Sequence, residues 1–366
     1  MKKTLTLALF LTSLYLPAQK NLDQAIQNLV RQETTKEQPL SGVILVADKG
    51  KVQSELVFGF RNFEKAVPLK KTDLFELASV SKQFTAMTIL MLQEKGLLQY
   101  DDLVEKYLKI PYAGIRIRHL LTHTSGLPDY QAIMDEHWDK SKVAGNADIL
   151  EYLNRYAPAR EFAPGEKYSY SNTGYVLLAS IVEKVSGQDF IAFCQQHIFQ
   201  PLHMTHTDIR TLAVKAATPN FALGYVYVAE KNRFIRADSF PSSNYTIWLG
   251  NRKGPGRISS TAQDLLLWDR ALYTEKLVKK ATLQQAFTSG VLNDGKTSVH
   301  YGFGWEIEND ANLGAIVQHT GNNPGYTARI IRFIDADKTI IILCNNAYKQ
   351  FEKIAMGVRV LIGGKE

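Results

Sequence analysis

The amino-acid sequence predicts an α+β fold in which an antiparallel β-sheet flanked by helices carries a mostly helical insertion. Three observations support this prediction. Strand-like runs occur towards both ends of the chain, in residues 42–59 and 302–344. A helix that is apolar almost all round, including Phe84 and Leu92, follows the first of these runs. Helical patterns separated by Pro- and Gly-rich loops fill much of residues 98–255.

The N-terminal segment has the composition of a secretory signal peptide. Met1-Lys2-Lys3 precedes an apolar run from Leu5 to Leu16, and Pro17-Ala18 follows it. The run is short for a membrane span, so we expect residues 1–18 to be removed on export; a retained N-terminal anchor is the alternative. Export would place the mature protein in the periplasm or outside the cell, without a stable membrane span.

A helix and a hairpin are predicted before the apolar helix. Apolar residues at the 3.6-residue period predict an amphipathic helix over residues 22–30. Two β-rich runs, in residues 42–47 and 52–59, are joined through Asp48-Lys49-Gly50, which favours a tight turn. The apolar helix then begins near Ser79.

The remaining elements follow from the same periodicities. The insertion is expected to contain three helices and a small hairpin, at residues 149–156, 175–185, 190–199 and 225–235. Ser260 or Thr261 can cap the next helix. The last hundred residues predict four strands and a closing helix, at residues 302–307, 315–318, 328–334, 339–344 and 351–361. The sheet domain would therefore comprise residues 19–97 and 256–366, with 98–255 inserted between them.

Composition narrows the class of protein. The 366 residues are 45% hydrophobic and 22% charged, which is typical of a soluble globular chain with one large or two interlocked domains. The net charge of +7 would fall to +5 on loss of Lys2 and Lys3, and the basic residues are dispersed, which argues against a nucleic-acid partner. Cys194 and Cys344 give no disulfide framework and are expected to be core thiols.

The start of the apolar helix places Ser79 three residues before Lys82. Positions i and i+3 lie on one face of a helix, so the serine hydroxyl and the lysine amine can meet. A serine hydroxyl is a poor nucleophile until a base takes its proton, and a desolvated lysine can be that base. The spacing alone is common at solvated helix starts, so the other parts of an acyl-transfer site must come from elsewhere.

A second polar stretch, Tyr168-Ser169-Tyr170-Ser171-Asn172-Thr173-Gly174, precedes an apolar helix. The Tyr170 phenol can move a proton if a neighbouring ammonium lowers its pKa. Asn172 offers both a donor and an acceptor to an amide substrate. The alternative is a helix cap formed by one of the polar residues in this stretch.

A third stretch, Gln318-His319-Thr320-Gly321-Asn322-Asn323-Pro324-Gly325, follows a predicted strand. A basic residue, a hydroxyl and a glycine at a strand edge can hold a carboxylate or carbonyl oxygen while the backbone comes close. An ordinary hairpin turn is the alternative.

Two other plans for hydrolysis are less well supported. His119 and His123 have the spacing of helical metal ligands, but no Glu adjoins His119 and no third ligand is evident, so capping or packing is favoured. A Gly-x-Ser-x-Gly nucleophile elbow is absent from the sequence.

Ser79-x-x-Lys82, Tyr170-x-Asn172 and His319-Thr320-Gly321, in this order, resemble the motifs of the serine β-lactamase and penicillin-binding-protein superfamily, in its class C β-lactamase and DD-peptidase branch. The resemblance runs from about residue 41 to 345. Further stretches that agree with it are His119 to Leu127, Pro201-Leu202-His203-Met204 and Tyr301-Gly302-Phe303-Gly304-Trp305.

The resemblance implies a β-lactamase/transpeptidase-like fold and a role for each motif residue, without metal or cofactor. Ser79 would be the acylated nucleophile, Lys82 its general base, and Tyr170 the proton relay to the leaving group. Asn172 would bind the substrate amide, and His319, Thr320 and Gly321 would line the site. The backbone N–H groups of Ser79 and Asn322 would form the oxyanion hole.

One departure bears on the substrate. β-Lactamases of this branch usually carry Lys-Thr-Gly where this chain has His319-Thr320-Gly321, and the histidine form resembles DD-carboxypeptidases, D-amino-acid peptidases and esterases. A peptide or ester substrate is therefore expected. The alternatives are a class C-like β-lactamase and a non-catalytic module that binds cell-wall fragments or a partner.

Overall fold

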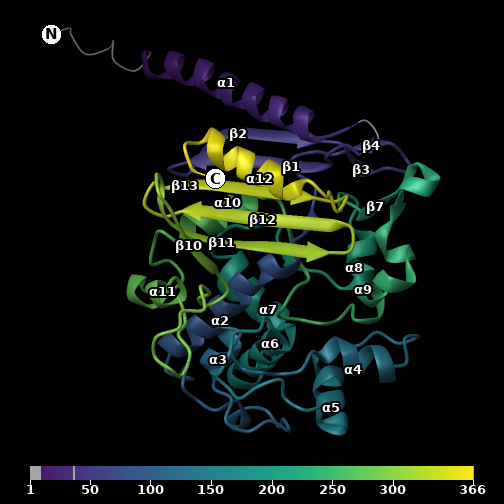
Figure 1. Cartoon of the computed structure of the whole chain (residues 1–366), viewed down its shortest axis with the longest axis vertical. Coiled ribbons are helices and arrows are strands. Elements are labelled where there is room, and N and C mark those ends of the chain that lie inside the picture. Colours follow the sequence, from purple (N-terminus) through teal and green to yellow (C-terminus); the bar gives the residue numbers. More distant parts are fainter. Residues whose placement is uncertain (1–9, 36–37, 366) are drawn as a thin grey trace, which may run out of the picture.

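The computed structural model describes residues 10–35 and 38–365 (Figure 1). Half of the predicted signal peptide, residues 1–9, lies outside them, and residues 10–18 belong to the beginning of α1 (Phe10–Glu33). Within the described ranges, no helix combines the length and the apolar character that crossing a membrane requires.

A six-stranded antiparallel sheet, in the order β10-β11-β12-β13-β1-β2, forms the centre of the molecule (Figure 1). Strand β1 pairs with β13, placing Ile44 opposite Ile342, so the sheet joins the two ends of the chain. The strands are β1 (Gly42–Asp48), β2 (Lys51–Phe58), β10 (Glu306–Asp310), β11 (Gly314–Asn323), β12 (Tyr326–Phe333) and β13 (Lys338–Cys344).

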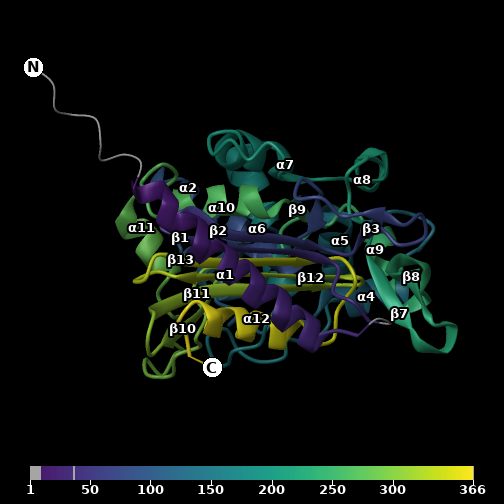
Figure 2. The same ribbon diagram turned by 90° about the horizontal axis from the view of Figure 1, so that it is seen from above.

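Helices cover both faces of this sheet. On one face, α1 and α12 (Phe351–Leu361) pack over Ile340 and Ile342 (Figures 1 and 2). On the other face, Ile341 and Leu343 belong to the larger core, which includes α2 (Lys82–Glu94), α6 (Asn172–Ser186) and α10 (Ala262–Ala271). Because successive residues of β13 point to opposite faces, one continuous apolar strand supplies both cores. This architecture confirms the predicted α+β class.

The middle of the chain is mostly helical, and smaller sheets connect it to the central one. Strand β9 (Ile258–Ser260) lies between β5 (Phe75–Glu76) and β6 (Asp208–Ile209). The division of the chain at residues 98 and 255 stays a prediction. The other helices and strands are β3 (Phe60–Asn62), β4 (Val67–Pro68), α3 (Ile117–Leu121), α4 (Tyr130–His137), α5 (Asn146–Tyr156), α7 (Phe190–Cys194), α8 (Leu212–Ala217), β7 (Tyr225–Val228), β8 (Arg233–Arg236), α9 (Tyr245–Trp248) and α11 (Lys280–Ala286).

The predicted strand at residues 302–307 is wrong for most of its length. Residues 302–305 form a turn, and β10 begins only at Glu306. A side chain on Gly302 would meet the carbonyl oxygen of Ala286, and one on Gly304 would meet that of Lys82. The alternation of aromatic residues with glycine imitates a strand, but the glycines are present because this turn presses against α2 and α11.

Several other predictions from the sequence are confirmed. The hairpin of β7 and β8 and the closing helix α12 form as expected, and Cys194 and Cys344 are both buried free thiols. Strand β11 is longer than predicted and extends to Asn323. The His319-Thr320-Gly321 motif therefore lies within a strand, where β10 pairs only with the preceding residues, 314–318.

Candidate active site

The turn that begins α2 brings Ser79 and Lys82 together. Ser79 lies in a short 3₁₀ segment (Ala78–Ser81), and Lys82 is the first residue of α2. Lys82 Nζ is 3.0 Å from Ser79 Oγ, as the i,i+3 spacing predicted. Ala78 has a φ of +49°, a strained value for a residue with a Cβ, so the turn is held by its surroundings.

The surroundings of Lys82 favour a neutral amine. Its side chain is completely buried (0% exposed), and Nζ also contacts Asn172 Oδ1 at 2.9 Å and the Pro255 carbonyl oxygen at 3.0 Å. Burial, and then the positive charge of Arg252, hold the pKa of Lys82 well below its ordinary value. In the neutral amine these two oxygens take the two N–H bonds, which leaves the nitrogen lone pair for the Ser79 hydroxyl.

Tyr170 lies beside the same pair but differs from the expectation about its pKa. Although the residue is 41% exposed, its hydroxyl shares a hydrogen bond with Ser79, and Lys82 Nζ lies 4.7 Å from the centre of its ring. Burial of the hydroxyl raises the pKa of Tyr170, and the bond to Ser79 opposes this only in part. A neutral Lys82 amine, which the lowered pKa of Lys82 favours, offers no ammonium to lower the pKa of Tyr170. The phenol is therefore protonated in the free protein.

The stretch around Asn172 forms the helix cap considered for it and also places Asn172 beside Lys82. Ser171 caps α6, because its side chain accepts a hydrogen bond from the Gly174 N–H at 3.2 Å. Thr173 donates to the Pro128 carbonyl at 2.7 Å. The Asn172 side chain is thereby left to bind Lys82.

His319 lies beneath the site rather than on its surface. The residue is 1% exposed, its Nδ1 is 2.7 Å from the Thr320 carbonyl oxygen, and its Nε2 is 2.8 Å from the Tyr301 hydroxyl. Since a carbonyl only accepts, Nδ1 carries the proton and Nε2 accepts from Tyr301. Burial, followed by the positive charge that Lys82 gains when it is protonated at low pH, lowers the pKa of His319 to about 3, so the imidazole is neutral at pH 7. Thr320 is half-exposed and Asn322 is exposed.

The depressed pKa of His319 has a consequence for stability. Between about pH 3 and its unfolded value near 6.5, the unfolded chain binds more protons than the folded one. Stability is therefore lost as the pH falls through this range, by about 1.4 kcal/mol per pH unit for each such histidine. We expect His319→Gln to flatten the dependence of the free energy of unfolding on pH, measured by urea denaturation from pH 7 to 4.

The matched control for this experiment is His300→Gln, because His300 is exposed. It should keep the wild-type slope. Equal slopes for His319→Gln and the wild type would contradict a neutral His319.

Gly321 allows β11 to approach Ser79. A Cβ at this position would lie 2.1 Å from the Leu77 carbonyl oxygen and 3.1 Å from the Ser79 backbone nitrogen. We expect Gly321→Ala to displace the strand and to lower the rate of acylation about tenfold to a hundredfold, because errors of about 1 Å in an active site have effects of this size. The measurement is the rate of covalent labelling by a fluorophosphonate.

Gly145→Ala provides a control, since a Cβ there meets Asn251 only at an ordinary 3.5 Å. It should label at close to the wild-type rate. A Gly321→Ala protein as fast as this control would show that the close approach is not needed.

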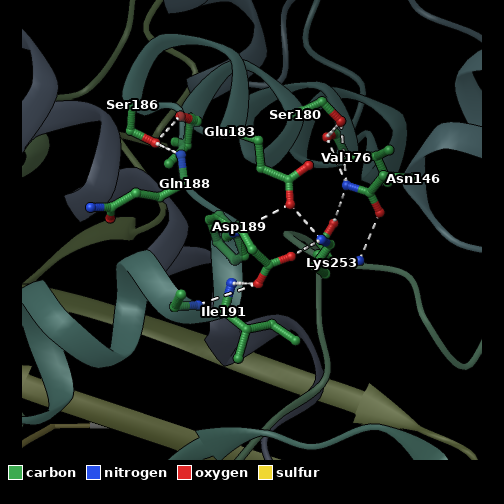
Figure 3. Close-up of polar contacts among 12 residues, drawn as sticks. Asn146, Val176, Ser180, Glu183, Ser186, Gln188, Asp189, Ile191 and Lys253 are labelled. Atoms are coloured by element: carbon green, nitrogen blue, oxygen red, sulfur yellow. Dashed lines mark hydrogen bonds and ion pairs between the residues drawn. The ribbon is translucent and has the colours of Figure 1, made fainter.

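The segment that supplies the Pro255 carbonyl is anchored firmly (Figure 3). Lys253 forms ion pairs with Glu183 and, at 2.7 Å, with Asp189. The Asn146 side chain accepts from the Lys253 N–H at 2.8 Å and donates to the Lys253 carbonyl at 3.1 Å (Figure 3). Thr85 of α2 also donates to the Gly254 carbonyl at 2.8 Å. The positions of Arg252 and Pro255 are thereby fixed relative to α2.

A small polar cleft opens in front of Ser79, and sequence reasoning missed several of its residues. Tyr245 lines it, whereas the nearby Trp248 is buried. In the sequence, Glu76 is a single acidic residue between Phe75 and Leu77, with no motif around it. Arg252 and Arg257, which sequence reasoning also missed, lie in a Gly- and Pro-rich segment. The lining residues are Glu76, Ala78, Ser79, Gln131, Asn172, Tyr245, Arg252, Pro255, Gly256, Arg257, Asn322 and Asn323.

The two histidines considered as metal ligands bind backbone groups instead. His119 Nδ1 accepts from the Arg116 N–H at 3.1 Å, and His123 Nδ1 accepts from the Ser171 N–H at 3.0 Å. The His123 ring also packs 4.2 Å from that of Tyr170, centre to centre. Among the residues the structure describes, no group of three or more His, Cys, Asp or Glu side chains could hold a metal ion.

The sequence is similar to a known protein family and to a penicillin-binding protein. The sequence model described as Beta-lactamase matches residues 23–363. Penicillin-binding protein 4* of Bacillus subtilis is 41% identical over 329 residues, which cover 89% of this chain and 72% of that protein.

Solved structures share the fold. A penicillin-binding protein from Bacillus halodurans superposes with a TM-score of 0.77 at 24% identity, over 93% of this chain and 98% of that one. A D-amino acid amidase from Ochrobactrum anthropi, solved with L-phenylalanine amide, gives a TM-score of 0.74 at 21% identity, over 93% and 98% of the two chains.

Proposed function

This chain belongs to the Beta-lactamase family and is a serine hydrolase; on that premise, we propose that it is exported and cleaves a peptide or an ester through an acyl-enzyme on Ser79. The observation that carries the proposal is the contact of 3.0 Å between Ser79 Oγ and Lys82 Nζ, with the N–H bonds of the neutral amine directed elsewhere. Lys82 takes the serine proton as the oxygen attacks the substrate carbonyl.

Tyr170 then passes a proton to the leaving group. Its hydroxyl is protonated and shares a hydrogen bond with Ser79, which supports this role. The same hydroxyl is the candidate to activate the water that releases the acyl group. Its ring is held by packing against His123.

Backbone N–H groups of Ser79 and Asn322 form the proposed oxyanion hole, where each donor is typically worth about 3 kcal/mol. Both residues line the cleft, and the close approach at Gly321 brings their strand and turn together. Asn172 would bind the substrate amide and Thr320 would lie beside the scissile bond. His319 would act from beneath, by positioning Tyr301 and the strand.

The third motif favours peptides and esters over β-lactams. The Lys-Thr-Gly of related β-lactamases supplies a permanent cation, whereas His319 is buried and neutral. A DD-carboxypeptidase or D-amino-acid peptidase activity, or an esterase activity, fits this difference, and the amidase among the similar structures is named for an amide substrate. A class C-like β-lactamase remains the alternative. Export rests on the sequence of residues 1–18.

Labelling and turnover together test this proposal. A fluorophosphonate should add once to the wild-type protein, and peptide mapping should place the adduct on Ser79. The turnover panel comprises a D-Ala-D-Ala peptide, a D-amino-acid amide, a short-chain ester and a cephalosporin. Faster turnover of the peptide, amide or ester than of the cephalosporin is expected, and exhaustive chelation should leave the rate unchanged. Binding of peptidoglycan peptides without labelling or turnover would indicate a non-catalytic module instead.

A further inference from the structure

The floor of the cleft holds more positive than negative charge. Glu76 is 3% exposed, and its two oxygens contact Lys215 Nζ at 2.7 Å and Asn323 Nδ2 at 2.6 Å. Burial would raise the pKa of Glu76, but Lys215 and Arg257 bring it down to about 2, so it is ionised. With Arg252, which also acts on Glu76, three cations surround one carboxylate. Lys215 approaches Glu76 from outside the cleft, whereas Glu76, Arg252 and Arg257 line it and together carry a net charge of +1.

Arg257 is the least satisfied of these cations. It is 5% exposed, and its Nη1 lies 3.3 Å from the Thr246 carbonyl oxygen and 3.7 Å from Glu76 Oε1. Its Nε and Nη2 are buried without a hydrogen-bond partner among the described residues. Buried donors of a guanidinium are costly to leave unpaired, and an ionised acceptor would satisfy two of them at once. Its φ of +81°, unusual for a residue with a Cβ, indicates that the surrounding fold imposes this placement.

Arg252 lies on the nucleophile's side of the cleft. A Cβ added to Gly256 would lie 3.5 Å from Arg252 Nη2 and 3.7 Å from the carbonyl oxygen of Ala78, the residue before Ser79. The Arg252 guanidinium and the turn that carries Ser79 are therefore close to the same point. Arg252 donates through Nη1 to the Tyr130 hydroxyl, while its Nε is buried without a partner in the part of the chain that the structure describes. The anchoring of the adjacent Lys253 fixes this position (Figure 3).

We propose that Arg252 and Arg257 form a binding site for a carboxylate of the substrate, immediately beside Ser79. The proposal rests on the function proposed above and assigns a chemical class to its substrate. Because the imidazole of His319 is buried, neutral and fully hydrogen-bonded, the arginines of the cleft, not the third motif, supply the positive charge. The carboxylate can be the free terminus of a peptide or the side chain of an acidic residue, since both present the same pair of oxygens.

Calorimetric titration can test the site without turnover. The protein is the full chain carrying Ser79→Ala, and the ligands are N-acetyl-D-alanyl-D-alanine, its carboxamide, and N-acetyl-D-alanyl-D-glutamic acid α-amide, whose only carboxylate is in the side chain. A carboxylate ligand should bind about tenfold to a hundredfold more tightly than the carboxamide, the range expected for charge-assisted hydrogen bonds. If the peptide with the free C-terminus binds more tightly, the site recognises a terminal carboxylate. If the glutamic acid α-amide binds more tightly, the site recognises a side-chain carboxylate.

Variants assign the gain to the arginines. Arg257→Gln and Arg252→Gln should each remove most of the preference for a carboxylate, whereas Arg233→Gln, an equal change of charge on an exposed hairpin residue, should keep it. If circular dichroism shows that Arg257→Gln does not fold, Arg257→Lys retains the charge without the paired donors and should lose part of the preference. The proposal would be overturned if the Ser79→Ala protein bound the carboxylate ligands and the carboxamide equally, or bound none of them. It would also be overturned if the arginine variants lost affinity for the carboxylate ligands and for the carboxamide by the same factor.

A separate measurement keeps this result distinct from the test of the hydrolase. Proteins with Ser79 intact are labelled with a neutral fluorophosphonate, which needs no carboxylate site. Failure to label the wild type would overturn the acyl-enzyme proposal, whereas the titrations report on the anion site alone.

Discussion

Ser79→Ala should abolish hydrolysis, with a loss of turnover on the order of 10⁵- to 10⁶-fold, as when other serine hydrolases lose their nucleophile. The physical reason is that only Ser79 Oγ faces the lone pair of Lys82, while alanine offers no atom to acylate. Stability should change little, because Ser79 is half-buried and the substitution removes a single hydroxyl group. The measurements are turnover of the best substrate from the panel and mass spectrometry after labelling.

Ser81→Ala is the matched control for this variant. Ser81 lies in the same turn but is buried, and its Oγ accepts from the Ile258 N–H at 3.2 Å. Its loss should lower the free energy of unfolding by about 1 kcal/mol and leave the labelling of Ser79 intact. Full labelling of a Ser79→Ala protein would assign the nucleophile elsewhere.

Lys82→Met should lower the rate of acylation by roughly 10³- to 10⁴-fold, the upper part of the range for loss of a general base. Methionine keeps much of the volume of the buried chain but cannot take the Ser79 proton. The variant should also be at least as stable as the wild type at neutral pH, because a buried amine costs free energy that a thioether does not.

The lowered pKa of Lys82 also predicts how stability and labelling change with pH. The folded pKa of Lys82 lies below the unfolded value, so the unfolded chain binds more protons between the two, and the contribution of Lys82 to stability falls as the pH falls. The wild-type labelling rate should fall with it, as the amine becomes protonated. Lys95→Met, at the exposed end of α2, should behave like the wild type. A Lys82→Met protein that labels at the wild-type rate would rule out this base.

Much of the fold could be predicted from the sequence because burial has a clear period. The continuous apolar run in β13 reflects cores on both faces of the sheet, and the 3.6-residue spacing in α12 reflects packing against one of them. The prediction failed at residues 302–305 because two glycines alternate there for a tertiary reason, the approach to α2 and α11. Local patterns do not record such contacts between distant segments.

The candidate site was predictable in its reacting groups but not in its electrostatics. The i,i+3 rule alone brings Ser79 to Lys82, since both lie on one turn. By contrast, the neutral state of Lys82 depends on burial and on Arg252, and the raised pKa of Tyr170 depends on desolvation. Arg257 carries no motif and is recognised only by its unpaired donors in the folded structure.

The pairing of β1 with β13 determines when this protein can become active during its synthesis. A ribosome that has made Ser79 and Lys82 has still to add β11, whose Gly321 closes the site, and β13, which pairs with the first strand. Contacts between distant segments make folding slow, because the chain loses the entropy of loop closure before the paired strands stabilise it. An incomplete chain therefore has the proposed nucleophile and its base but no finished cleft, so we expect hydrolysis to begin only after the C-terminal strands are complete.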